Sequence, residues 1–173
     1  MPRAPLMTPA GHARTTLSTQ GNGDTIAVVG RYRVTTEADV IGARVAAERL
    51  ALQEGFPRLA AQEVALVTSE LAWNLVRHAG GGEIELAMTN GPHGPALVVA
   101  AIDGSPPIAD LETALLDGHT ANGPIPPEER MRRRGLGSGL GAALRLSDRL
   151  VQETLPKGKR IVATRYLVRP GRQ

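Results

Sequence analysis

The sequence predicts an α+β fold: a two-layer α/β sandwich with a mixed, mostly antiparallel sheet and helices on one face. The expected elements follow the order strand, helix, helix, strand, strand, long connection, helix, strand, strand. Adjacent strands joined by short loops pair antiparallel, and helices that follow one another can cover a single face of the sheet. A chain of 173 residues, of which 42% are hydrophobic, is large enough to bury one core between two such layers.

The N-terminal part of the chain predicts a tail and then a first strand. Residues 1–23 hold several Pro, Gly, Ser and Thr residues and show no hydrophobic periodicity, so we expect a disordered tail there and one domain over residues 24–169. The run TIAVVGRYRV, residues 25–34, has the partial alternation of a strand.

Two helices are expected next. The first spans residues 39–54, with Thr35 or Thr36 as its N-cap and the run EGFP at its end. The apolar residues that recur in it at helical spacing are Ile41, Val45 and Leu52. The second helix spans residues 60–79, and a run of three glycines ends it. Its apolar stripe consists of Val64, Val67, Leu71 and Leu75.

The second half of the chain predicts four more strands and one more long helix. Strands begin at Glu83 and Ala96, with the hairpin loop TNGPHGP between them. The connection over residues 104–134 is rich in Pro and Gly and contains one short helix, ADLETALL; connections this long are usually lids or binding loops. The remaining elements are a helix over residues 135–150 and strands over residues 150–154 and 160–168.

Composition excludes several classes of function. The absence of cysteine excludes disulfides, thiol catalysis and thiolate zinc sites. No apolar run approaches the roughly 20 residues that span a bilayer, and no signal-peptide core is visible, so we expect a cytoplasmic protein with no membrane partner. The basic residues are scattered, the net charge is +3 and only one Trp, two Tyr and one Phe are present, so we expect no nucleic-acid partner.

Glu70 and Asn74 are the first candidate site residues. They lie four residues apart on the second helix, so their side chains are neighbours beside its apolar stripe. A carboxylate and an amide that face one cleft suit Mg²⁺, which prefers oxygen ligands. The alternative is a solvated helix edge, and this segment alone favours that alternative.

Asp103 is the second candidate. It ends a strongly apolar strand and precedes Gly104. An ionised carboxylate in this place can accept a strong hydrogen bond from an exocyclic amine such as that of adenine. Taken alone, the run Asp-Gly-Ser-Pro-Pro is more simply interpreted as a turn.

Alternating glycines before the last long helix form the third signal. Gly135, Gly137, Gly139 and Gly141 would let backbone amides approach a polyphosphate. The segment is not a Walker loop, because the Lys-Ser/Thr pair is missing, and it lacks the βαβ context of a dinucleotide site. The alternative is a flexible hinge.

In their order along the chain, these segments resemble the Bergerat ATP-binding fold of the GHKL superfamily over residues 25–168. The runs SELAWNLVRHAGGG, DLETALLDGHT and GLGSGLGAALRLSD are most similar to stressosome switch kinases and anti-sigma regulatory factor serine/threonine kinases. The resemblance implies ATP and Mg²⁺ as cofactors, Asn74 as the Mg²⁺ ligand and Glu70 as the catalytic base. It implies an ATP-binding role for Asn74, Asp103, Gly104, Ile108, Gly135, Leu136, Gly137, Gly139, Leu140 and Gly141, with Asp103 at the adenine amine.

The function implied by this resemblance is that of an ATP-dependent serine/threonine protein kinase in a bacterial partner-switching system, of the stress or anti-sigma type. Its substrate would be a STAS-domain antagonist protein, and a PPM-type phosphatase, a sigma factor or a second copy of the chain are further candidate partners. The alternative is a non-catalytic or weakly ATP-binding module of the same fold that sequesters a partner.

Three features depart from the family's pattern. The first glycine box, Asp-x-Gly-x-Gly in the family, has Ser105 and Pro107 in place of its two glycines. Lys159 stands where relatives commonly carry Thr beside the adenine, and residues 121–134 lengthen the lid. The changed glycine box favours the binding-module alternative. His78, near the apolar stripe of the second helix, is expected to pack in the core rather than to bind a ligand.

Overall fold

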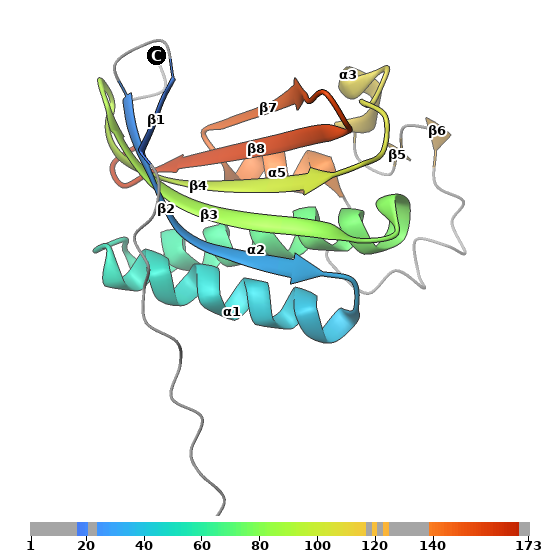
Figure 1. Ribbon diagram of the computed structural model, residues 1–173. Helices are drawn as coiled ribbons and strands as arrows, with labels where there is room; N and C mark the ends of the chain where they lie inside the picture. Colours follow the sequence, from blue (N-terminus) through green and yellow to red (C-terminus); the bar gives the residue numbers. More distant parts are fainter. Residues whose placement is uncertain (1–16, 21–23, 117–118, 121–122, 125–138, 170–173) are drawn as a thin grey trace, which may run out of the picture.

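Two layers make up the molecule, a sheet and the helices that cover one of its faces (Figure 1). The computed structural model describes residues 17–20, 24–116, 119–120, 123–124 and 139–169. The predicted two-layer α+β sandwich with a mostly antiparallel sheet is confirmed, since every ladder within these ranges is antiparallel.

The main sheet has six strands, and a separate ladder has two. The spatial order of the main sheet is β1 (Leu17–Gln20), β2 (Asp24–Val34), β3 (Gly82–Gly91), β4 (Gly94–Asp103), β8 (Lys159–Tyr166) and β7 (Arg149–Thr154). The small ladder joins β5 (His119–Thr120) and β6 (Gly123–Pro124). The helices are α1 (Glu37–Gln53), α2 (Arg58–Asn74), the π-helix η1 (Leu75–Ala79), α3 (Leu111–Ala114) and α5 (Leu140–Leu146). None of these helices is long and apolar enough to cross a bilayer.

The edge strand β1 lies within the segment that we predicted to be a disordered tail. Its residues pair with β2, from Leu17 opposite Ala27 to Gln20 opposite Asp24. The other residues of that predicted tail, 1–16 and 21–23, lie outside the described residues.

A capping box starts α1. The Thr36 hydroxyl accepts a hydrogen bond from the Asp39 N–H at 3.3 Å, and Asp39 Oδ2 accepts one from the Thr36 N–H at 2.8 Å. Thr36 is therefore the N-cap, and the helix begins at Glu37, two residues before its predicted start.

The buried face of α1 is not the face that its largest apolar residues mark. Ile41 and Val45 are 57% exposed and Leu52 is 49% exposed. An apolar stripe normally faces the core, but the core side of this helix consists of Val40, Ala43, Ala47, Leu50 and Ala51. The helix was predicted correctly, while this stripe faces outward because small side chains let α1 pack closely on α2.

The predicted stripe of the second helix is confirmed. Val64, Val67, Leu71 and Leu75 are each at most 2% exposed. The α-helical part ends at Asn74, five residues before the predicted end at residue 79, and the chain continues as the π-helix η1. Such wider turns are frequent at functional sites.

The predicted seven-residue hairpin loop between β3 and β4 is wrong. Thr89 pairs with Ala96 and Gly91 with Gly94, so only Pro92 and His93 form the turn. The Gly and Pro residues suggested a loop, but Gly94 adopts a φ of 87° that closes a tight turn and leaves its neighbours in the ladder.

The last helix is shorter than the predicted range of 135–150. The structure shows α5 from Leu140 to Leu146; residues 125–138 lie outside its description. Asp148 leaves the helix because its N–H donates to the Thr164 carbonyl at 2.8 Å, and β7 begins at the next residue. The short helix expected after Ile108 is present as α3.

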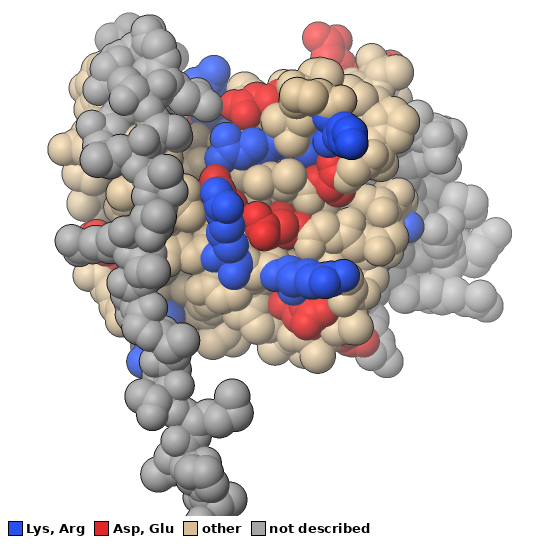
Figure 2. Space-filling model, viewed as in Figure 1, with Lys and Arg blue, Asp and Glu red and all other residues tan. Residues whose placement is uncertain are grey.

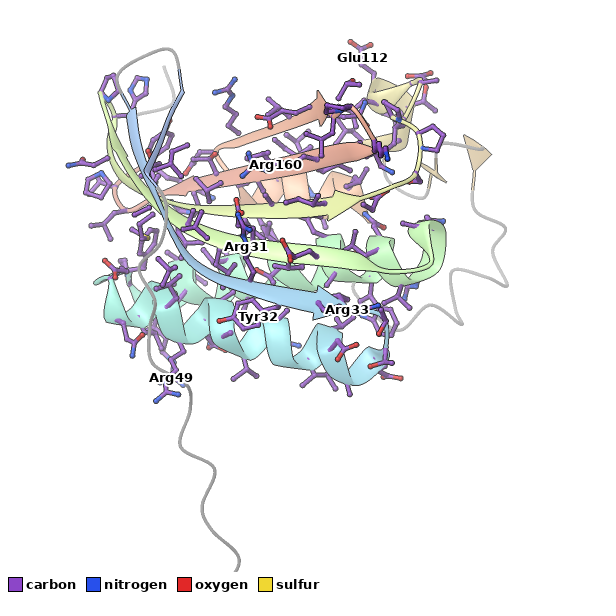
Figure 3. All side chains as sticks on the ribbon, in the orientation of Figure 1. Arg31, Tyr32, Arg33, Arg49, Glu112 and Arg160 are labelled. Carbon is purple, nitrogen blue, oxygen red and sulfur yellow. The ribbon has the colours of Figure 1, made fainter. Side chains whose placement is uncertain are left out.

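The face of the sheet away from the helices is charged (Figure 2). Glu85, 5% exposed, accepts hydrogen bonds from Arg31 at 3.0 Å and from Arg160 at 2.7 Å. Arg160 also pairs with Glu153 at 3.3 Å. Figure 3 labels Arg31 and Arg160 on this face, and their acidic partners offset their positive charge.

Candidate functional site

A cleft of about 390 Å³ opens where α2 and η1, the ends of β4 and β8, and the start of α5 meet. Small-molecule sites commonly measure roughly 300–1,000 Å³ and combine an apolar floor with a few polar groups. The residues that line it are Leu71, Asn74, Leu75, His78, Ala79, Ala101, Asp103, Ser105, Pro106, Pro107, Ile108, Ala109, Ala114, Gly139, Leu140, Lys159 and Ile161. A nucleotide-sized molecule fits this volume.

Asn74 and Asp103 border the same cleft from different layers of the molecule. Asn74 is the last residue of α2, and Asp103 is the last residue of β4, where it is 8% exposed. Leu71, Leu75 and Ala101 supply apolar floor between them. The sequence predicted both residues as site residues, and the fold brings them together.

His78 follows Asn74 by one turn and also lines the cleft. Its side chain is exposed, so the expectation of a packed core histidine is wrong. The π-helical turn over Leu75–Ala79 changes the direction of the side chains after Asn74. The prediction assumed a regular α-helix with 3.6 residues per turn, so it did not include this change.

Glu70 lies one turn before Asn74 and is 4% exposed. It is not among the residues that border the cleft. Asn74 supplies an amide oxygen that fits Mg²⁺, an ion that in nucleotide sites takes few protein ligands and completes its shell with phosphate oxygens and water. The donor set at this end of the cleft therefore fits Mg²⁺ held together with a polyphosphate.

Asp103 is engaged by two residues that depart from the family's pattern. Its Oδ1 accepts hydrogen bonds from the Ser105 N–H at 2.8 Å and from the Ser105 hydroxyl, and it pairs with Lys159 Nζ at 2.9 Å. Lys159 Nζ donates to the Ser105 hydroxyl as well. The side chains of Lys159 and Asp103 are 10% and 5% exposed, so this is a buried ion pair. Sequence reasoning named Ser105 and Lys159 separately but did not predict that they contact each other.

Close backbone packing holds the triad of Asp103, Ser105 and Lys159 in place. A side chain on Gly158 would put its Cβ 1.9 Å from the Asp103 carbonyl oxygen, and Gly158 has a φ of 97°. The absence of a side chain there lets β8 start directly against the end of β4, which sets Lys159 opposite Asp103 in the ladder.

The segment after Asp103 forms one wall of the cleft. Pro106 and Pro107 border the cleft, and its volume of about 390 Å³ remains with both rings in place. Ile108 is held by Gln152 of β7, whose side-chain amide accepts from the Ile108 N–H at 2.9 Å and donates to its carbonyl at 3.1 Å. Gln152 had no signal in the sequence, because its role depends on the position of β7 at the sheet edge.

The remaining predicted site residues divide into three groups. Gly139 and Leu140 line the cleft at the start of α5. Gly104 and Gly141 follow the bordering residues Asp103 and Leu140 in the sequence but do not border the cleft themselves. Gly135, Leu136 and Gly137 lie outside the described residues.

Comparisons with known proteins agree with the resemblance seen in the sequence. The chain is 29% identical to the serine/threonine-protein kinase RsbT of Bacillus subtilis (strain 168) over 136 residues, which cover 78% of this chain and 94% of that protein. The solved SiaB-SiaC complex from Pseudomonas aeruginosa matches 79% of this chain and 90% of its own, with a TM-score of 0.44 and 14% identity. Residues 34–165 match the family described as histidine kinase-like ATPase domain. Because that match spans most of the sequence and both ends of the cleft, the chain belongs to the histidine kinase-like ATPase domain family.

Proposed function

We propose that this protein is a cytoplasmic, ATP-dependent serine/threonine kinase of a bacterial partner-switching system, with a STAS-domain antagonist protein as its substrate and residues 24–169 as its kinase domain. The observation that carries the proposal is the cleft shared by Asn74 and Asp103. Its size and apolar floor suit a nucleotide with its base at Asp103 and its phosphates towards Asn74. The similarity to RsbT, a serine/threonine-protein kinase by name, supports the reaction.

Phosphoryl transfer requires mainly positioning and charge neutralisation. Asn74 would hold a magnesium ion, which would supply charge neutralisation at the phosphate oxygens, and backbone groups near Gly139 would lie beside the phosphates. The hydroxyl oxygen of the substrate serine or threonine forms a bond to the γ-phosphorus while the bond from that phosphorus to the bridging oxygen of ADP breaks. Glu70, one turn before Asn74, is the proposed acceptor of the hydroxyl proton. Because it is buried and does not border the cleft, this role requires its carboxylate to become accessible when the protein substrate binds.

Transfer of labelled γ-phosphate from Mg-ATP to a purified STAS-domain protein from the same organism tests the proposal. We expect Asn74→Ala to lower the rate by roughly 100-fold or more, because a metal ligand contributes several kcal/mol to the transition state. We expect Glu70→Gln to lower it by a similar factor. Asn90→Ala is the matched control, because Asn90 is exposed at the far end of β3. Wild-type transfer by a folded Asn74→Ala variant would contradict the proposal.

A non-catalytic partner-sequestering module is the second candidate. It is favoured by one observation: Oδ1 of Asp103 already accepts hydrogen bonds from Ser105 and Lys159. The partner would then be a STAS-domain protein, a phosphatase or a sigma factor. Calorimetry separates the two candidates, since absence of binding heat with millimolar ATP analogues, together with retained partner binding, leaves only the second.

A further inference from the structure

The carboxylate of Asp103 uses one of its two oxygens for the hydrogen bonds that it receives within the described part of the chain. All the hydrogen bonds that it receives within the described part of the chain fall on Oδ1, from the Ser105 N–H, the Ser105 hydroxyl and Lys159 Nζ. A carboxylate oxygen accepts about two hydrogen bonds, so Oδ1 is saturated. Oδ2 is the oxygen with capacity left for a ligand in the cleft that Asp103 lines.

Within the described residues, the ammonium group of Lys159 also has one hydrogen bond left to make. Of its three N–H donors, one points to Asp103 Oδ1 at 2.9 Å and one to the Ser105 hydroxyl. Lys159 lines the same cleft as Asp103, and a buried ammonium gains most when its last donor is satisfied. The triad therefore presents one acceptor and one charged donor side by side.

We propose that Lys159 is a base-reading residue: its free N–H donates to ring nitrogen N1 of adenine while Asp103 Oδ2 accepts from the N6 amine. The inference rests on the proposed function, because it requires a nucleotide base at this end of the cleft. Adenine offers one donor and one acceptor on this edge, which matches the two groups that the triad leaves open. Ser105 fixes the pair by holding both the carboxylate and the ammonium.

Guanine matches this arrangement less well. Its corresponding edge carries the O6 acceptor and two donors, N1–H and the N2 amine, and a carboxylate reads the two donors with both of its oxygens. Oδ1 of Asp103 is already saturated by Ser105 and Lys159. One guanine donor would stay unpaired in a desolvated site, which costs affinity.

The experiment measures the affinity of the wild-type chain for Mg-ATP, Mg-1-deaza-ATP and Mg-7-deaza-ATP by calorimetry. 1-Deaza-ATP replaces N1 by a carbon, and we expect it to bind at least about tenfold more weakly than ATP, as for a lost hydrogen bond to a charged group. 7-Deaza-ATP, changed on the other ring, serves as the ligand control and should bind as ATP does. GTP should bind more weakly than ATP.

The variant arm uses Lys159→Met, with Lys157→Met as its matched control on an exposed lysine of the same turn. Lys159→Met should bind ATP about as weakly as the wild type binds 1-deaza-ATP and should no longer distinguish the two nucleotides. The melting temperature of Lys159→Met shows whether the variant is still folded. The comparison of ATP with 1-deaza-ATP on the wild-type protein does not depend on this variant.

Three results would overturn the inference or its basis. Equal affinities of wild-type protein for ATP and 1-deaza-ATP overturn the role of Lys159 and leave the proposed function intact. Tighter ATP binding by Lys159→Met than by the wild type would show that the lysine blocks the base, and this result would also overturn the proposed role of Lys159. Absence of ATP binding to the wild type and to the folded variant overturns the proposed function and the inference together.

Discussion

At the scale of single residues, the site contains contacts that no local motif encodes. Asn74 and Asp103 could be named as candidates because the runs that contain them follow one another in the order of the ATP-binding fold that the sequence resembles, although each run alone favoured a simpler interpretation. The contact of Ser105 with Lys159 was not, because the two lie 54 positions apart in the sequence. It depends on the register that places Asp103 opposite Lys159 in the β4–β8 ladder. A change in that register by one residue would turn the lysine to the other face of the sheet.

Gly158 gives the first prediction at this scale. Gly158→Ala should lower the free energy of unfolding by at least about 2 kcal/mol, because the new Cβ meets the backbone of Asp103 at 1.9 Å and the residue has a φ of 97°. Urea denaturation measures the loss. Gly94→Ala is the control, with a φ of 87° and open space around its Cβ, and it should cost about 1 kcal/mol. Equal losses for the two variants would show that the close approach of β8 to β4 carries no energy.

At the scale of elements, α1 shows how periodicity predicts a helix without showing which face is buried. Alanines at 43, 47 and 51 form most of its core side, and the larger residues Ile41 and Val45 point outward. A hydrophobicity pattern gives more weight to large side chains than to alanine, so it points to the wrong face. The close packing of α1 on α2 decides which face of α1 is buried. That packing depends on both helices, so the sequence of α1 alone does not show it.

Two substitutions on α1 test this orientation. Ala47→Lys should destabilise the protein by more than about 3 kcal/mol, because residue 47 is 0% exposed and the site has no room or partner for an ammonium group. Val45→Lys, two residues away and 57% exposed, should change the free energy of unfolding by less than about 0.5 kcal/mol. Thermal denaturation of both variants tests this orientation of α1. A large loss of stability in Val45→Lys would mean that the face with Ile41 and Val45 is covered.

The capping box of α1 predicts a pH dependence. Hydrogen bonds from the Thr35 N–H, then from the hydroxyl and N–H of Thr36, lower the pKa of Asp39 from 3.8 to about 2. Because the folded pKa is the lower one, the contribution of Asp39 to stability is fully present above pH 3.8 and is lost as the pH falls through about 2.

As the pH falls through this acid range, the Asp39→Asn variant should therefore lose less stability than the wild type loses. Urea midpoints at a series of pH values between about 5 and 2 measure the slope for the wild type and the variant. Glu54→Gln, just beyond the other end of α1, controls for the loss of one negative charge. Identical slopes for Asp39→Asn and the wild type would contradict the assignment.

At the scale of the whole molecule, the order of elements was enough to predict the layers and the antiparallel sheet. Two errors came where a tertiary contact competes with a local signal, whereas the error at His78 came from a local π-helical turn. Glycine and proline suggested a long loop where cross-strand pairing continues to Gly91 and Gly94, and edge pairing makes β1 from a segment without periodicity. Five predicted site residues border the cleft, namely Asn74, Asp103, Ile108, Gly139 and Leu140. Its walls also depend on distant contacts such as that of Gln152 with Ile108.

The triad of Asp103, Ser105 and Lys159 also constrains how such a chain can evolve. Replacing Lys159 alone removes the countercharge of a buried carboxylate, and replacing Ser105 alone takes one acceptor from the ammonium group. Either single replacement leaves a buried polar group of the triad with one partner fewer, and because the three side chains contact one another, the effects of the two replacements should not add. Positions 105 and 159 are thus epistatic, and descendants of this lineage should inherit them as a unit.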